Sequence, residues 1–218
     1  MITHILSDIE GTTTAIAFVH RTLFPHAEAA LDGFLATQAA TPEVAALLAE
    51  VPGDDKAATL RDWMARDVKA TPLKAIQGMI WREGYASGAL RGHLWPDVAP
   101  ALRAWHARGL RLAIYSSGSE EAQRLLFRHS EAGDLEGLFD GFHDTRIGPK
   151  REAASYARIA AAWGAAPVAI LFLSDVAEEL DAARAAGLAT CQIVRAGDGT
   201  QPSGRHPQAA DLSGVDAC

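Results

Sequence analysis

The chain has 218 residues, enough for one large domain or for a core with a smaller inserted unit. Apolar residues make up 49% of the sequence and charged residues 22%, which is typical of an ordered globular protein and excludes general disorder. The formal net charge of -7 argues against affinity for nucleic acid. It does not exclude a small anionic substrate, because a phosphate group needs only one or two local cations or a metal ion.

The first residues, Met1 to Leu6, lack the basic flank of a signal peptide, and no apolar run approaches the ~20 residues of a membrane span. We therefore expect a cytoplasmic protein with no membrane partner. The two cysteines, Cys191 and Cys218, have neither metal-ligand spacing nor the pattern of a disulfide framework. No heptad pattern is evident, which favours a monomer.

Short apolar runs that end in small or polar residues are typical of parallel strands covered by helices on both faces. Four such runs occur, and a fifth, weaker candidate lies between the second and the third; in chain order they span residues 2–7, 110–115, 141–143, 168–173 and 190–194. Helical patterns follow most of them. The sequence therefore predicts an α/β fold with a doubly wound parallel sheet.

About a hundred residues separate the first two predicted strands, far more than a crossover connection needs. Thr41-Pro42 and Thr71-Pro72 are typical helix starts, and apolar residues recur at helical spacing after them. We predict that 1–14 and 94–218 form the catalytic core and that 15–93 is a helical cap inserted after the first strand. The Gly-, Pro- and Ser-rich chain after Ala196 is predicted to be an irregular tail.

Asp8 and Glu10 follow the first predicted strand directly, at the sheet edge where open α/β folds bind ligands. In an extended segment these two side chains point the same way, with Ile9 turned into the core. Gly11 permits a sharp turn, and Thr12 can hydrogen-bond to the turn. Two neighbouring carboxylates repel each other unless a proton or a divalent cation joins them, so this pair is a candidate metal or acid/base site.

Three further candidates follow later strand ends. Ser116 and Ser117 open a predicted helix at 120–129, where hydroxyls and free amides can hold phosphate oxygens, although a simple helix cap is the alternative. Lys150 precedes a predicted helix at 151–163 and could balance a phosphate charge, although a solvated side chain is the ordinary case. Asp175 ends the strand at 168–173 and could be a third magnesium ligand. Acidic residues on the following helix, Glu179 among them, are explained by the helix dipole alone.

Taken together, these segments resemble the haloacid-dehalogenase-type phosphatases, whose four motifs would be Asp8-Ile9-Glu10-Gly11-Thr12, Ser116, Lys150, and Asp175 with Glu179. Most of those phosphatases carry aspartate where this chain has Glu10. That difference, with Leu73-Lys74-Ala75-Ile76-Gln77-Gly78 and Phe172-Leu173-Ser174-Asp175-Val176, resembles the acireductone synthases, also called enolase-phosphatases. The resemblance covers nearly the whole chain. It departs at Pro149, where a polar residue is expected, and in the last twenty residues.

The resemblance implies a bifunctional enzyme of methionine salvage that enolises 2,3-diketo-5-methylthiopentyl-1-phosphate and then removes its phosphate to release the acireductone. It assigns Asp8, Glu10 and Asp175 to one Mg²⁺ per subunit, Ser116 and Ser117 to the substrate, and Lys150 to the substrate phosphate. Asp8 would be the nucleophile, and Glu10 the group that transfers protons in hydrolysis. Glu10 and a residue of the cap are the two candidates for the enolisation base.

Three alternative functions would each leave different features in the sequence. Another phosphatase of the same type, acting on a sugar phosphate or phosphoglycolate, is disfavoured by Glu10 and by the match in the cap. A dehalogenase would have no need of the metal that Glu10 and Asp175 imply. A silent binding module would be expected to have lost Asp8 or Lys150, and both are present.

Overall fold

The computed structural model describes residues 1–66, 68 and 70–215. The chain divides into two compact units, one formed by Met1–Ile16 with Gly92–Cys218 and the other by Ala17–Arg91. The first is the sheet unit and the second the helical unit. The assignment of 15–93 as a cap stays a prediction. The prediction that Cys218 binds no metal and forms no disulfide lies outside the described residues, whereas Cys191 is a buried free thiol.

The sheet unit contains a six-stranded sheet in the order β3-β2-β1-β4-β5-β6, and all its neighbouring strands are parallel. Its strands are β1 (His4–Ser7), β2 (Arg111–Tyr115), β3 (Gly141–His143), β4 (Ile170–Ser174), β5 (Ala189–Ile193) and β6 (Gln208–Ala209). The predicted doubly wound α/β fold is confirmed. The chain winds from β1 outward to β3 and then returns to β4 on the other side of β1, so the strand order reverses beside β1.

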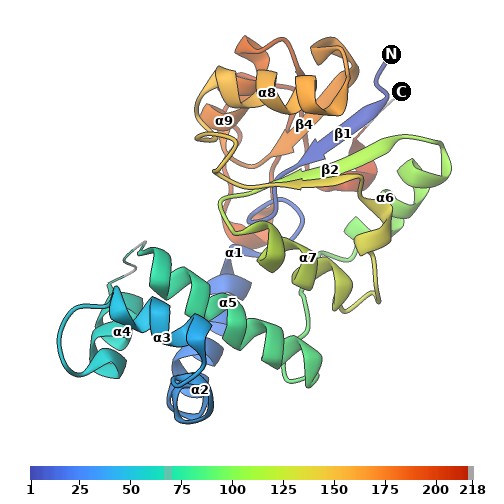
Figure 1. The fold of residues 1–218 in the computed structure, drawn as a ribbon. Coiled ribbons are helices and arrows are strands. Elements are labelled where there is room, and N and C mark those ends of the chain that lie inside the picture. Colours follow the sequence, from blue (N-terminus) through green and yellow to red (C-terminus); the bar gives the residue numbers. More distant parts are fainter. Residues whose placement is uncertain (67, 69, 216–218) are drawn as a thin grey trace. The chain divides into compact units, whose positions relative to one another are not determined.

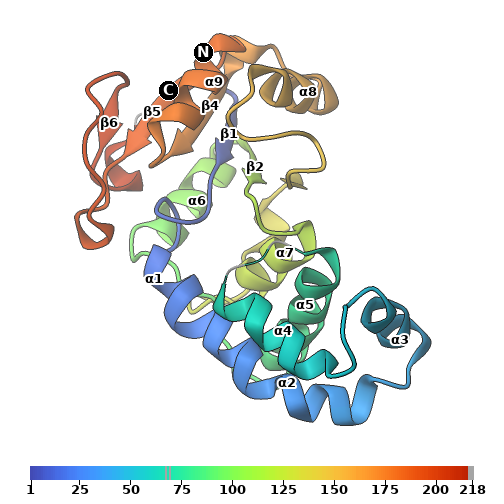
Figure 2. The same cartoon turned by 90° about the vertical axis from the view of Figure 1, so that its left-hand side faces the viewer.

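Helices cover both faces of this sheet, as Figures 1 and 2 show. They are α6 (Val98–Ala107), α7 (Glu120–Arg128), α8 (Ala153–Trp163) and α9 (Ala177–Ala185). Leu6, Phe172 and Tyr156 belong to one buried cluster between the sheet and α8 with α9. Burial on both faces explains why the central residues of β1, β2 and β4 are apolar.

The helical unit begins with the last residues of α1 (Ile16–Phe18) and a π-helical turn at Val19–Leu23. Four helices follow: α2 (Phe24–Gln38), α3 (Pro42–Ala49), α4 (Lys56–Ala65) and α5 (Thr71–Ala86). Leu31, Leu60 and Ile76 are fully buried in its own apolar core. Thr41 is the N-cap residue of α3, whereas α5 begins one residue earlier than predicted, at Thr71, with Ala70 as its N-cap.

The chain after Ala196 is more ordered than the sequence predicts. β6 pairs in parallel with β5, and short 3-10 turns lie at Ala196–Asp198 and Leu212–Gly214. Leu212 is only 1% exposed. A strand of two paired residues is too short to give a periodic sequence pattern, and isolated buried side chains give none either. The sequence alone therefore predicts an irregular tail.

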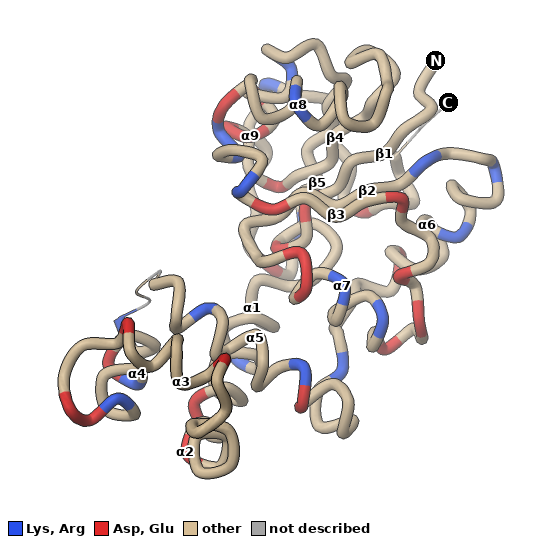
Figure 3. The backbone as a smooth tube through the Cα atoms, in the orientation of Figure 1, with Lys and Arg blue, Asp and Glu red and all other residues tan. Residues whose placement is uncertain are grey.

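Acidic and basic residues are interspersed along both units, as Figure 3 shows. Across the described residues, no helix is long and apolar enough to cross a membrane.

Candidate active site

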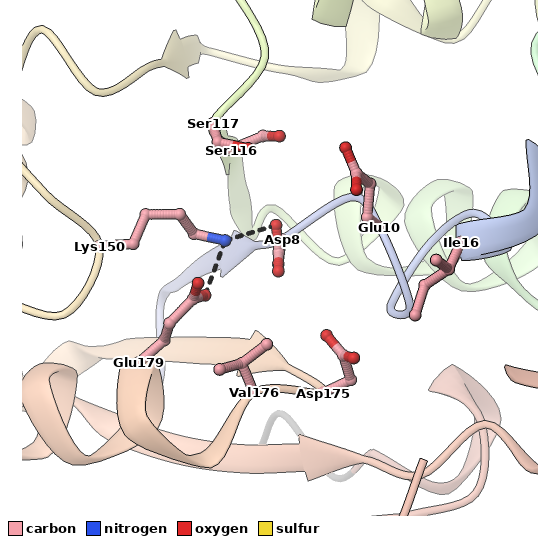
Figure 4. Close-up of a pocket in the computed structure, with 9 residues that line it drawn as sticks. All are labelled: Asp8, Glu10, Ile16, Ser116, Ser117, Lys150, Asp175, Val176 and Glu179. Atoms are coloured by element: carbon pink, nitrogen blue, oxygen red, sulfur yellow. Dashed lines mark ion pairs between the residues drawn. The ribbon is translucent and has the colours of Figure 1, made fainter. Parts of the chain in front are cut away.

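The carboxyl ends of β1, β2 and β4 meet at one pocket (Figure 4). All six residues predicted for the site line it, together with Ile16, Val176 and Glu179; the six are Asp8, Glu10, Ser116, Ser117, Lys150 and Asp175. Asp8 follows β1, Ser116 follows β2 and Asp175 follows β4, so neighbouring parallel strands deliver the three side chains to one edge. Lys150 comes from the loop before α8.

The loop after β1 turns tightly around the carbonyl of Ile9. Thr12, Thr13 and Thr14 all donate their backbone N–H groups to this oxygen, at 3.2, 2.9 and 2.9 Å. Gly11 has a φ of +70°, and a Cβ there would overlap with the carboxylate of Asp175. Only glycine therefore allows both the turn and the close approach of Asp175.

Asp8 is 4% exposed and is held by groups on several sides. Its Oδ1 accepts the backbone N–H of Ile9 at 2.7 Å and lies 2.7 Å from Lys150 Nζ, while Ser174 Oγ donates to Oδ2 at 3.4 Å. These contacts fix the orientation of the carboxylate, as a positioned nucleophile requires.

Lys150 Nζ also lies 2.6 Å from Oε2 of Glu179, so the ammonium is shared by two carboxylates (Figure 4). Burial disfavours its charged form, but the charges of Asp8 and Glu179 outweigh burial and raise the pKa of Lys150 above its ordinary value. Lys150 is therefore a cation whose side chain is only 10% exposed and whose charged form is stabilised by two carboxylates, in contrast to the solvated side chain of the alternative interpretation.

Glu179 is the site residue that the sequence interpretation undervalued. It lies on the first turn of α9, where a helix dipole accounts for any acidic residue, and its neighbour Glu178 is indeed exposed. Glu179 is 8% exposed, and burial followed by the charge of Asp8 raises its pKa to about 7. The sequence feature that pointed to a role for Glu179 is its position four residues after Asp175, within the fourth motif of the resemblance.

Asp175 fits a cation ligand. Burial and then the charge of Asp8 raise the pKa of Asp175 to about 7. The surrounding residues therefore do not offset the cost of burying its ionised carboxylate beside Asp8. Its Oδ1 is buried and accepts no hydrogen bond from the described part of the chain. Its backbone is held by Thr12 Oγ1, which accepts the Asp175 N–H at 3.0 Å. A divalent cation beside Asp8 and Asp175 would satisfy this oxygen and offset the repulsion.

Glu10 is placed differently from Asp175. In the view of Figure 4 its carboxyl group lies on the other side of Asp8, toward Ser116 and Ser117. Within residues 1–66, 68 and 70–215, no group of three or more His, Cys, Asp or Glu side chains is arranged to hold a metal ion. A metal site made from Asp8, Glu10 and Asp175 would therefore need an oxygen of Glu10, from its side chain or its backbone, beside the two aspartate carboxylates.

The turn after β2 contains a helix cap and residues that line the pocket, while phosphate binding there stays a prediction. Ser119 caps α7 by accepting the N–H of Ala122 at 3.2 Å. Ser116 instead lines the pocket, and its Oγ accepts the N–H of Gly118 at 3.3 Å. Gln123 donates to the carbonyl of Gly118 at 2.8 Å and so fixes the turn from behind. One tetrapeptide therefore contains both a helix cap and two residues that line the pocket.

Comparison with known proteins places this site in a family. The family model for haloacid dehalogenase-like hydrolases matches residues 2–187. The chain is 60% identical over 216 residues to the enolase-phosphatase E1 of Granulibacter bethesdensis, covering 97% of this chain and 94% of that protein. It is 54% identical over 211 residues to the enolase-phosphatase E1 of Pseudomonas syringae pv. tomato, covering 93% and 92%.

Among solved structures, the crystal structure of the UTR4 protein of Saccharomyces cerevisiae matches with a TM-score of 0.86 and 34% identity, covering 99% of this chain and 100% of that one. CbbY of Rhodobacter sphaeroides, in complex with xylulose-(1,5)bisphosphate, shares the fold with a TM-score of 0.66 and 20% identity, covering 99% and 96%. The chain therefore belongs to the haloacid dehalogenase-like hydrolases and, within them, to the enolase-phosphatase E1 family.

Proposed function

We propose that the protein is an acireductone synthase, which enolises 2,3-diketo-5-methylthiopentyl-1-phosphate and then hydrolyses its phosphate ester. The observation that carries the phosphatase half is the Asp8–Lys150–Glu179 arrangement: a fixed, buried carboxylate with a buried cation beside it. The relatives named enolase-phosphatase E1 support the enolase half and the substrate. Its cytoplasmic location and monomeric state remain predictions from the sequence.

In the phosphatase step, a carboxylate oxygen of Asp8 attacks phosphorus and forms an aspartyl-phosphate while the ester oxygen leaves. Lys150 reduces the repulsion between the two anions because its ammonium already lies 2.7 Å from Asp8 Oδ1. Ser116 and Ser117 bind the remaining phosphate oxygens from the opposite turn.

Two proton transfers accompany this step. The departing ester oxygen takes up a proton, and the water that later hydrolyses the acyl phosphate gives one up. Glu10 is the candidate for both, since it lines the pocket on the Ser116–Ser117 side. In the enolisation that precedes them, a base removes a proton next to a carbonyl; Glu10 and a residue of 15–93 stay the candidates.

Mg²⁺ is the proposed cofactor, and the residues that would hold it are Asp8 and Asp175, through their carboxylates, and Glu10, through a side-chain oxygen or its backbone carbonyl. The buried, unpartnered Oδ1 of Asp175 supports this assignment. When bound, the ion supplies positive charge that stabilises developing negative charge on oxygen.

Asp8→Asn tests the nucleophile. The variant keeps the shape of the side chain but removes the attacking charge, so we expect loss of phosphate release with an unchanged circular dichroism spectrum. Normal turnover would remove Asp8 from the mechanism.

Ultraviolet detection of the acireductone formed from the diketone phosphate tests the enolase half. Phosphate release without that signal would favour a phosphatase for another small ester.

A further inference from the structure

The loop that carries Lys150 has four consecutive backbone carbonyls, and each accepts a hydrogen bond from a different side chain. The carbonyl of Ile147 accepts from Arg158 Nε at 2.6 Å, and that of Gly148 from Tyr115 Oη at 2.7 Å. The next two, of Pro149 and Lys150, accept from Ser155 Oγ at 2.8 Å and Tyr156 Oη at 2.7 Å. We call the four donors the carbonyl cradle: Tyr115, Ser155, Tyr156 and Arg158.

The cradle comes from rigid elements. Tyr115 ends β2, and the other three donors lie on α8. The rings of Tyr115 and Tyr156 pack edge to face, with centroids 5.4 Å apart, and both residues are 0% exposed. The two hydroxyls therefore have fixed positions, because neither ring can rotate away without opening the core.

The loop itself is shaped to meet these donors. Gly148 has a φ of +139°, a conformation that residues with a Cβ rarely adopt. A Cβ there would overlap with Ser155 Oγ and with the guanidinium of Arg158. The loop backbone therefore approaches the cradle as closely as glycine allows.

Fixing the loop backbone matters because Lys150 Nζ has two demanding contacts, at 2.7 Å to Asp8 and 2.6 Å to Glu179. A lysine side chain has four rotatable bonds and otherwise holds no single geometry. Charge stabilisation of a transition state depends on groups that are already in place before reaction.

We propose that the carbonyl cradle positions Lys150 for phosphoryl transfer, with Tyr156 as the main positioning residue because it holds the carbonyl of Lys150 itself. The inference rests on the proposed function, since it assumes that Lys150 acts on the phosphate. It assigns a part in the reaction to a tyrosine that is not among the residues lining the pocket.

A double-mutant cycle tests the proposal. Tyr156→Phe removes only the hydroxyl, and the loss of one hydrogen bond to the loop should lower kcat/KM roughly three- to tenfold, mainly through kcat. In a Lys150→Met background, assayed at raised enzyme concentration, the same change should have an effect under about twofold, because no ammonium is left to position. An equal fold-loss in both backgrounds would overturn the proposal and leave Tyr156 as a stability residue.

Tyr115→Phe provides a second cycle, should Tyr156→Phe lower the melting temperature too far for assay. Its expected coupling to Lys150→Met has the same sign but is smaller, because Tyr115 holds the carbonyl two residues earlier. Tyr85→Phe is the matched control: it removes the same atom from a residue that is 3% exposed in the helical unit, and kcat/KM should change less than about twofold.

The cycle is measured with p-nitrophenyl phosphate and with the diketone phosphate. Wild-type hydrolysis of the first without acireductone from the second would refute the proposed function, while the cycle on p-nitrophenyl phosphate still decides the role of the cradle. Hydrolysis of neither would overturn both.

Discussion

Replacing Asp175 by asparagine should remove much of the pH dependence of stability that the protein shows in a metal-chelating buffer. Burial, followed by the charge of Asp8, raises the pKa of Asp175 from 3.8 to about 7 in the folded state. Between these values the folded protein holds a proton that the unfolded chain releases. The stabilisation is therefore complete below pH 3.8 and is lost as the pH rises through 7.

The size of the effect follows from the same values. A difference of about three pH units corresponds to about 4 kcal/mol. Only the two units between pH 5 and 7 fall within the measured range, and they correspond to about 2.7 kcal/mol. Asp175 retains some contact with solvent, which weakens the penalty, so we expect Asp175 to contribute about 2 kcal/mol of the fall in unfolding free energy between pH 5 and 8. Glu179, with its pKa also raised to about 7, adds a fall of the same sign.

Urea unfolding in EDTA, at half-unit steps from pH 5 to 8, measures this fall for the wild type and for Asp175→Asn. The variant should retain the fall due to Glu179, together with the opposite rise due to His4 and His143, whose pKa values are lowered by burial. Glu178→Gln is the matched control, because this exposed carboxylate lies three residues after Asp175, on the first turn of α9, and its pKa is lowered, chiefly by a backbone hydrogen bond. Curves for Asp175→Asn and the wild type that agree within about 0.5 kcal/mol at every pH would refute the reasoning.

Three further outcomes are expected. Mg²⁺ should raise the melting temperature more near pH 8 than near pH 5.5, because it competes with the protons on the carboxylates; equal shifts would argue against a carboxylate site. Gly11→Ala should reduce activity far more than Gly109→Ala, since both have positive φ but only the first places a Cβ on Asp175; equal activities would contradict this. Arg195→Met should cost about 3 kcal/mol in urea unfolding, because it removes a buried guanidinium and takes the ion-pair partner from Asp97, whose side chain is only 15% exposed. Arg205→Met, in exposed ion pairs, should cost under about 1 kcal/mol, and similar losses for the two variants would refute the distinction.

The residues around Arg195 illustrate what pattern analysis cannot recover. Its guanidinium donates to both carboxylate oxygens of Asp97, at 2.7 and 2.9 Å, and also to the carbonyl of Thr12 at 3.0 and 2.8 Å. These residues are 98 and 183 positions away from Arg195 in the chain. No local pattern links them, yet together they support the loop that follows Asp8.

Strands β1 to β5 and the chain order of the site residues could be predicted from local sequence, whereas β6 could not. A parallel strand buried on both faces must be apolar, and the polar residue that follows it must lie at the ligand-binding edge, so Asp8, Ser116 and Asp175 could be identified from local sequence. Tertiary structure alone decided which neighbours complete the site. Whether Glu178 or Glu179 faces Lys150 depends on the rotation of α9 against the sheet, and the carbonyl cradle depends on how β2 and α8 approach one loop. Both are set by packing between distant segments, which local sequence does not encode.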